Sequence, residues 1–116
     1  MSNKLVNVID SDGHTIIARV KLNSYLDFWN GHNFQSDDGP GRHKGLTKLA
    51  DGRFVLIHDS DYEGDRPWAE VISPEEALQQ ILWSGKTDLL EKEQFSELKQ
   101  LAEEILIKEV KENLEG

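Results

Sequence analysis

Apolar and polar residues alternate along the first part of the chain, a period of two that is typical of a β-strand with one solvent-facing side. Residues 4–9 and 14–22 both show this alternation, most clearly between Ile16 and Leu22. The Asp-Ser-Asp-Gly sequence at 10–13 separates them and consists of residues that turns favour. The two segments therefore predict an antiparallel hairpin.

A second hairpin is indicated by the Asp-Gly pair at 51–52, because this pair is preferred in two-residue type I′ turns. Such a turn joins residues 46–50 to residues 53–58 and places Leu49 opposite Phe54. The run that starts at Phe54, Phe-Val-Leu-Ile, is apolar on both faces, which predicts a strand in the middle of the sheet.

Three other segments surround this hairpin. Residues 68–72 predict a short further strand. Residues 25–29, Tyr-Leu-Asp-Phe-Trp, suit an aromatic strand as well as a helical turn, and the capping residues Asn23 and Ser24 favour the helical turn. Residues 32–44 show no periodicity and predict a loop, which at this length is usually functional or mobile.

Two helices are predicted towards the C-terminus. Ser73 is a good N-cap, Pro74 fits the first helical position and Glu76 completes a capping box, so a helix should span about residues 74–84. Its expected buried residues are Ala77, Leu78, Ile81 and Leu82, with Trp83 also expected in the core. A second helix is expected over about residues 88–113. Its broad apolar face consists of Phe95, Leu98, Leu101, Ala102, Ile105, Leu106, Val110 and Leu114.

Strands followed by helices are the order of an α+β fold. We expect an antiparallel sheet of about five strands, two hairpins plus one strand, covered on one face by the two C-terminal helices. Residues 1–116 are expected to form a single domain, with the strands within residues 4–72. The sequence shows no βαβ pattern and no glycine-rich phosphate loop.

The net charge of −9 narrows the possible partners. Nucleic-acid binding depends on Lys and Arg side chains that neutralise phosphates, so direct binding to nucleic acid is not expected. An acidic surface instead suits a partner protein with a basic surface. The chain has no cysteine, which excludes disulfides and thiol chemistry, and no apolar run of signal or membrane-span length, so a cytoplasmic location is expected.

Residues 59–70, Asp-Ser-Asp-Tyr-Glu-Gly-Asp-Arg-Pro-Trp-Ala-Glu, resemble the calcium loop of the EF-hand family, with acids at positions one, three and five, Gly at six and Glu at twelve. The resemblance implies a ligand set of Asp59, Asp61, Glu63 and Glu70, with the carbonyl of Asp65. Arg66 and Pro67 depart from the pattern, and the segment lies between predicted strands instead of helices. We therefore favour an acidic hairpin loop without a cofactor and keep calcium as the alternative.

The histidines form no established metal or catalytic motif, because none has HExxH or HxH spacing. His32 and His43 share a loop with Asp37 and Asp38, which leaves a metal set of two histidines and one carboxylate open. No serine lies in a GxSxG elbow, and we expect no enzyme activity.

Aromatic residues lie next to both loops, where exposed aromatic residues often anchor interfaces. Together with charged residues of the loops they give one candidate partner-binding set: Trp29, His32, Phe34, Arg42, His43, Asp59, Asp61, Tyr62, Glu63, Asp65 and Trp68. These residues form one site only if residues 29–44 and residues 59–68 lie at the same end of the sheet.

The sequence therefore favours a small acidic protein-binding module with a basic, nucleic-acid-handling partner, for instance a bacterial or phage accessory or inhibitor protein. Two alternatives stay open. One is a small-ligand or calcium-binding domain that uses residues 59–70, and the other is a structural homodimer through the C-terminal helix in place of a monomer.

Overall fold

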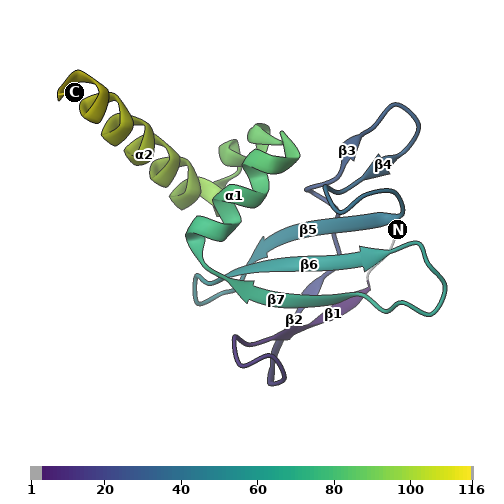
Figure 1. Cartoon of the computed structure of the whole chain (residues 1–116). Coiled ribbons are helices and arrows are strands. Elements are labelled where there is room, and N and C mark those ends of the chain that lie inside the picture. Colours follow the sequence, from purple (N-terminus) through teal and green to yellow (C-terminus); the bar gives the residue numbers. More distant parts are fainter. Residues whose placement is uncertain (1–3, 116) are drawn as a thin grey trace.

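The chain folds around a five-stranded sheet with the strand order β2-β1-β7-β6-β5 (Figure 1). The computed structural model describes the backbone of residues 4–115 and the side chains of residues 4–108. The strands of this sheet are β1 (Leu5–Ile9), β2 (Ile16–Lys21), β5 (Arg42–Lys48), β6 (Phe54–Ser60) and β7 (Trp68–Ile72). Helices from the C-terminal part of the chain pack on one face of the sheet, so the predicted α+β class is confirmed.

The sheet is mixed instead of wholly antiparallel, which corrects the expectation from the sequence. β1 runs parallel to β7, with Val8 opposite Ala69 and Ile9 opposite Glu70, whereas the other neighbouring strands are antiparallel. The N-terminal hairpin therefore pairs with the edge of β7 that β6 leaves free. It does not pair with β5, the next strand of this sheet along the chain. A parallel pair needs no turn between its strands, so no local sequence signal indicates it.

The β5–β6 hairpin has the predicted central strand but a different turn. Lys48, and not Leu49, lies opposite Phe54. The Leu49 N–H donates to the Arg53 carbonyl (2.8 Å) and the Gly52 N–H donates to the Leu49 carbonyl (2.9 Å), which leaves a three-residue loop. In this loop only Gly52 has a positive φ (+96°), as in a type I turn that ends on a left-handed glycine. The register is therefore one residue away from the predicted one.

The segment between the two hairpins contains a small second sheet. β3 (Phe28–Trp29) and β4 (Phe34–Gln35) pair antiparallel. Part of the predicted helical turn is present, because the Asp27 N–H donates to the Ser24 carbonyl (3.0 Å), but residues 28–29 are a strand. β4 and the start of β5 correct the predicted loop at residues 32–44. Bulky aromatic residues pack well in paired strands, and here the rings of Trp29 and Phe34 meet edge to face with 5.1 Å between their centres.

Helix α1 (Pro74–Ser84) begins with the predicted cap, because the Ser73 hydroxyl accepts a hydrogen bond from the Glu76 N–H (3.1 Å). It ends at Gly85, which is left-handed with φ +73°. The predicted second helix is divided into three elements: the 3₁₀ helices η1 (Thr87–Glu91) and η2 (Glu93–Phe95), and the helix α2 (Ser96–Glu115). The chain therefore turns twice more before α2 begins.

The main core lies between the sheet and the helices. It consists of Leu26, Leu46, Phe54, Leu56, Ile72, Ala77, Leu78, Ile81, Leu89, Phe95 and Leu98. Leu82 and Trp83, which were expected there, are exposed (54% and 59%). Consecutive helical residues point about 100° apart, so when Ala77, Ile81 and Ser84 face the core, the two residues between Ile81 and Ser84 turn away from it.

Only the first half of α2 joins this core. Leu98 is buried, whereas Ile105 and Leu106, predicted on the same apolar face, are exposed. The side chains of Val110 and Leu114 lie outside the described residues. After its first turns α2 therefore leaves the body (Figure 1). Neither α2 nor any other helix within residues 4–115 combines the length and the apolar character needed to cross a membrane.

On its opposite face the sheet bends, so that its own strands cover the core there. β1 and β2 run at a steep angle to β5 and β6 (Figure 1). A second core forms on this face from Val6, Val8, Val55, Ile57 and Ala69. In the described part of the chain no helix packs on this core, so the bend of the twisted sheet takes the place of a second helical layer.

Candidate binding surface at one end of the sheet

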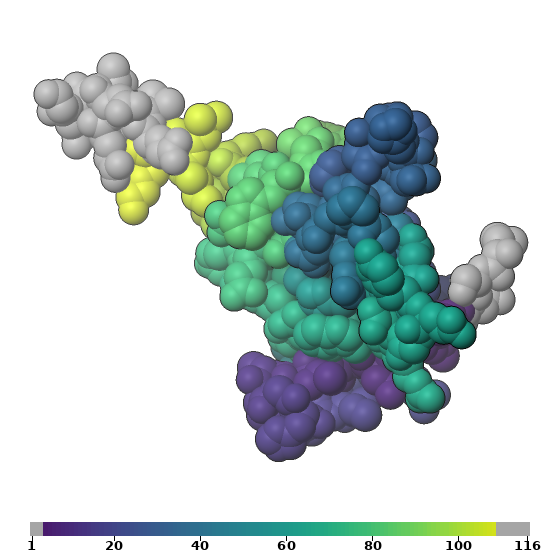
Figure 2. Space-filling model, turned by 45° about the vertical axis from the view of Figure 1, so that its right-hand side comes forward, coloured from purple at the N-terminus to yellow at the C-terminus, as the bar shows by residue number. Residues whose placement is uncertain are grey.

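Two loops that are far apart in the sequence meet at one end of the sheet. The Asp61 N–H donates to the Gly41 carbonyl (2.9 Å) and the Tyr62 hydroxyl donates to the Pro40 carbonyl (3.3 Å). Figure 2 shows both segments on the same flank of the molecule, one in blue and one in teal. The chain before β5 and the chain after β6 are therefore held together, as a single site requires.

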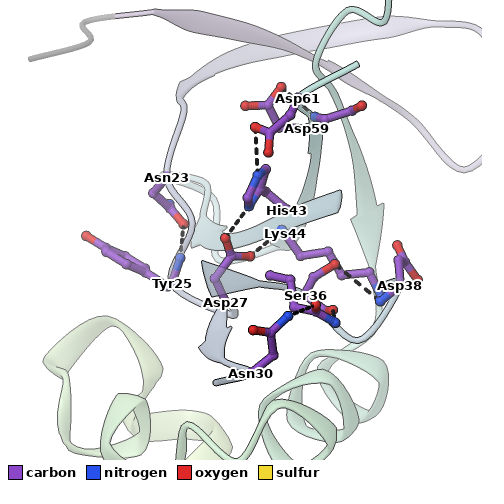
Figure 3. Close-up of polar contacts among 12 residues, drawn as sticks. Asn23, Tyr25, Asp27, Asn30, Ser36, Asp38, His43, Lys44, Asp59 and Asp61 are labelled. Carbon is purple, nitrogen blue, oxygen red and sulfur yellow. Dashed lines mark hydrogen bonds and ion pairs between the residues drawn. The ribbon is translucent and has the colours of Figure 1, made fainter. Parts of the chain in front are cut away.

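His43 lies between two carboxylates that belong to different loops (Figure 3). Its Nδ1 is 2.5 Å from Asp27 Oδ2 and its Nε2 is 2.9 Å from Asp61 Oδ1. Asp27 is buried, and its second oxygen accepts the backbone N–H of Lys44 (3.0 Å). A neutral imidazole has one N–H, so the ring donates to both carboxylates only when it is protonated.

The charge of the His43 ring depends on a balance of two effects. Burial by itself lowers the pKa of His43, because it disfavours the charged ring. The hydrogen bonds to Asp27 and Asp61 and the negative charges of both act in the opposite direction and together raise the pKa above its ordinary value of 6.5. His43 therefore bridges the loops up to a higher pH than an exposed histidine would.

Lys44, the next residue of β5, is buried. Its Nζ donates to Asp37 Oδ1 (2.8 Å) and to Gln80 Oε1 (3.2 Å), and it lies 3.3 Å from Asp38 Oδ1. A buried ammonium group is tolerated only with such partners. Lys44 therefore ties the turn before β5 to helix α1.

Alternation along β5 divides these contacts between the two faces of the sheet. His43 is paired with Asp59, and Lys44 with His58, which is in turn paired with Trp68. Neighbouring residues of a strand point to opposite faces. The candidate residues consequently wrap around the end of the sheet and do not form one flat patch.

Asn23 fixes the segment that carries Asp27. Its side-chain amide donates to the Leu46 carbonyl (3.1 Å), and its Oδ1 accepts the Leu46 N–H (3.1 Å). This close approach requires a glycine on β5, because a Cβ atom on Gly45 would lie 2.2 Å from the Asn23 carbonyl oxygen. Gly45 and Asn23 thus place the buried carboxylate against His43.

The acidic segment 59–70 spans the connection between β6 and β7, between strands as predicted. Three of its carboxylates are engaged by basic side chains: Asp61 by His43 (2.9 Å), Asp65 by Arg42 (3.1 Å) and Glu70 by His58 (2.6 Å). Among the described side chains, those of residues 4–108, no group of three or more His, Asp or Glu is arranged to hold a metal ion. Calcium binding by this loop stays a hypothesis, and it would have to break these contacts.

Four aromatic side chains near the loops are exposed. Trp29 and Phe34 form the edge-to-face pair of β3 and β4, at 58% and 60% exposure. Tyr62 lies under the Arg42 guanidinium, with 4.8 Å between the guanidinium carbon and the ring centre. Trp68 stacks on the His58 imidazole, with 4.3 Å between the ring centres. Aromatic residues in such positions offer large contact areas with little loss of side-chain freedom.

Two shallow hollows flank the joined loops. One, of about 300 Å³, is bordered by Trp68 and Arg42, and the other, of about 410 Å³, by Phe34 and His43. Asp59 borders both hollows. Each hollow combines an aromatic wall with charged groups, a composition that suits a side chain of a partner protein.

Two of the candidate residues stand apart from the rest. His32 lies in the turn between β3 and β4, where its backbone N–H donates to Asn30, and its side chain is exposed. Glu63 is also exposed at the tip of its loop. Because Asp37 and Asp38 contact Lys44, the set of two histidines and one carboxylate does not assemble.

Sequence reasoning missed Asp27 and Lys44, the two buried charged residues of the site. The alternation of β5 held a signal for Lys44, because it shares a face with Leu46, which points to the main core. Asp27 had no comparable signal, since its segment was assigned to a helical turn.

The contacts of His43 suit a structural role and do not suit proton transfer to a substrate. Both ring nitrogens are engaged by carboxylates, and in the described part of the chain no serine or threonine hydroxyl is hydrogen-bonded to the ring. A general base needs a free nitrogen within reach of the substrate proton. The geometry therefore favours a structural bridge at His43.

Comparison of the chain with family models, with curated proteins and with solved structures finds no match. The function is therefore argued from the geometry and charge of this surface.

Proposed function

We propose that the chain is a protein-binding module whose contact surface is formed by residues 29–44 and residues 59–68. The observation that carries the proposal is the contact of His43 with Asp27 and Asp61, which joins the loops while the aromatic side chains around them stay exposed. A surface that is fixed in advance loses little entropy on binding, and exposed aromatic residues are the usual anchors of interfaces.

A protein with a basic surface is the partner that suits this end of the molecule. The chain has a net charge of −9, and among the described residues Asp59 and Glu63 have no basic side chain as a partner. Charge of opposite sign speeds association and disfavours acidic partners. We propose a nucleic-acid-handling protein, because carboxylates can occupy a basic groove in place of phosphates. The chain would then act as an inhibitor in the cytoplasm, as bacterial or phage accessory proteins do.

The test is a titration with an arginine-rich peptide as a model of a basic groove, followed through backbone amide chemical shifts. We expect the shifts to concentrate in residues 29–44 and 59–68. Asp59→Asn with Glu63→Gln should weaken binding several-fold. The matched control, Glu103→Gln with Glu104→Gln in α2, changes the net charge equally and should have a much smaller effect.

A second arm tests the aromatic anchors. Trp29→Ala should weaken binding about tenfold, as loss of a central interface anchor does. Trp83→Ala removes an equally exposed tryptophan outside the loops (59% against 58%) and should leave affinity unchanged. Equal losses in variant and control, or shifts spread over the whole acidic surface, would mean that binding follows net charge only and would contradict the proposal.

A further inference from the structure

Helices α1 and α2 leave a groove of about 310 Å³ between them. Three exposed apolar side chains line it, Leu82 and Trp83 from α1 and Ile105 from α2. Single exposed apolar residues are normal on a protein surface, but a contiguous group of this kind marks a contact site.

The part of α2 that follows the groove exposes three consecutive apolar side chains. Ile105, Leu106 and Ile107 are consecutive and are 43%, 61% and 56% exposed. Consecutive helical residues point about 100° apart, so the body of the same chain cannot cover all three. A second hollow, of about 350 Å³, lies on the other flank of α2 and is bordered by Leu90 and Leu106. Exposed apolar side chains that adjoin hollows on two flanks of a helix form a surface that a partner can cover.

This part of the helix also projects from the body. Figure 1 shows α2 leaving the sheet and α1, and its backbone continues as helix from Ile105 to Glu115, about 15 Å at 1.5 Å per residue. The sequence of this stretch includes the apolar residues Val110 and Leu114. A helical segment this short gains most of its stability from packing. The described side chains of this stretch, residues 105–108, are all exposed, so a partner from outside the chain would supply this packing.

We propose that the partner is a second copy of the same chain, and that the projecting part of each α2 lies in the α1–α2 groove of the other copy. Each chain carries both halves of this contact, an apolar groove and a projecting helix with exposed apolar side chains. The two halves cannot meet within one chain, because α2 itself forms one wall of the groove. A two-fold axis near Ile105 satisfies both halves at once.

The charges at the margin agree with this pairing. Glu75 borders the groove, and Lys108 is exposed on the projecting helix. An exchanged helix brings such side chains of opposite sign together at the rim, where they favour one orientation of the helix over the reverse.

The exposed apolar area is that of a weak dimer. Leu82, Trp83, Ile105, Leu106 and Ile107 together present roughly 400 Å² of apolar surface on each copy, given the usual sizes of buried side chains. Apolar atoms make up about 65% of a homodimer interface, so the two copies would bury about 1,200 Å² in all. That lies at the lower limit of specific interfaces, the class of weak and transient contacts. The loop surface of residues 29–44 and 59–68 shares none of these residues, so the dimer does not depend on the proposed function.

The test is sedimentation velocity on the full chain from about 1 μM to about 1 mM, a range that covers weak association. The wild-type chain should pass from monomer to dimer. Ile107→Glu should raise the dissociation constant at least about 100-fold, because it places a charge in an apolar contact. Ile16→Glu is the matched control, since Ile16 lies on β2 with nearly the same exposure (58% against 56%), and it should leave the dimer intact.

A mixing experiment separates an exchanged helix from a simple contact between two α2 helices. Trp83→Glu damages the groove and Ile107→Glu damages the helix, so each variant alone has two damaged contacts in its dimer. A mixed dimer keeps one contact fully intact. The mixture should therefore associate more strongly than either variant alone, with helix content by circular dichroism unchanged in both.

Three outcomes would overturn the proposal. They are a wild-type chain that stays monomeric to about 1 mM, a control Ile16→Glu that dissociates as readily as Ile107→Glu, and a mixture that associates no better than its components. A monomeric chain whose groove binds some other protein would also count against a second copy as the occupant.

Discussion

Replacing His43 with Gln tests the bridge between the two loops most directly. Gln is neutral at every pH, and its amide can still donate to Asp27, so the variant imitates the unprotonated ring. Wild-type protein and His43→Gln therefore differ mainly in the charge of one side chain. The difference in their free energies of unfolding should consequently depend on pH.

The structure sets the size of this difference. The Asp27 side chain is 7% exposed and that of His43 18%, and a hydrogen bond to a charged group in such a place contributes about 1.5–3 kcal/mol. Asp61 is 72% exposed, so its contact adds at most about 1 kcal/mol. We expect the protonated wild-type protein to be more stable by about 2 kcal/mol. For 116 residues this corresponds to roughly 8 °C in Tm.

The sign of the pH dependence follows from the direction of the pKa shift. The pKa of His43 is raised in the folded state above its ordinary value of 6.5. Its stabilising contribution is therefore fully present below the unfolded pKa and is lost as pH rises through the folded pKa. Urea unfolding between about pH 5 and pH 9 should show the widest gap between the two proteins at the acidic end. The other histidines are common to both proteins and cancel.

Two results would refute this reasoning. One is a gap that stays constant or widens as the pH rises, because the ring would then not be the titrating bridge. The other concerns the two carboxylates: Asp27→Asn should destabilise clearly more than Asp61→Asn, since only Asp27 is buried. Equal losses would show that burial of the Asp27 contact has no energetic weight.

Two further substitutions test how β5 positions the loops. Gly45→Ala should lower the free energy of unfolding by about 3 kcal/mol, because its Cβ atom would lie 2.2 Å from the Asn23 carbonyl oxygen. Urea unfolding measures this loss. A variant as stable as the wild-type protein would contradict the close approach. Lys44→Met should change global stability by less than about 1 kcal/mol, because an apolar side chain suits the buried site and Asp37 and Asp38 are accessible to water. It should nevertheless speed amide hydrogen exchange in the turn before β5, and unchanged exchange would show that Lys44 does not hold this turn.

Sequence patterns predicted the structure correctly where residues adjacent in the chain determine it. The cap at Ser73 follows from a few adjacent residues, and the run from Phe54 is buried on both faces as its pattern predicts. The failures concern choices that depend on distant partners. The parallel pairing of Val8 with Ala69 has no local signal. In the β5–β6 turn an Asp-Gly pair suits two turn types, and the strands select between them.

The candidate site shows the same division. The exposed aromatic residues and the acidic loop could be recognised from composition alone, and their meeting at one end of the sheet follows from the β5–β6 pairing. The buried charges could not be foreseen, because burial of Asp27 and Lys44 depends on contacts across the fold, such as that of Lys44 with Gln80 on α1. The prediction that Trp83 lies in the core was wrong for a related reason: each helical residue points about 100° away from the one before it, so a shift of one or two residues separates core from solvent.

Three consecutive basic residues at the start of β5, Arg42, His43 and Lys44, reduce the negative charge that a partner meets. In this acidic chain they serve as internal counter-ions for the loops: Arg42 for Asp65, His43 for Asp27 and Asp61, and Lys44 for Asp37 and Asp38. The carboxylates left for a basic partner at the acidic loop are those of Asp59 and Glu63, so the surface offered is smaller than the sequence suggests. Neutralising Asp61 or Asp65 would also remove an ion pair that joins the loops. Only the pair Asp59 and Glu63 tests a partner's charge without disturbing the surface that the partner meets.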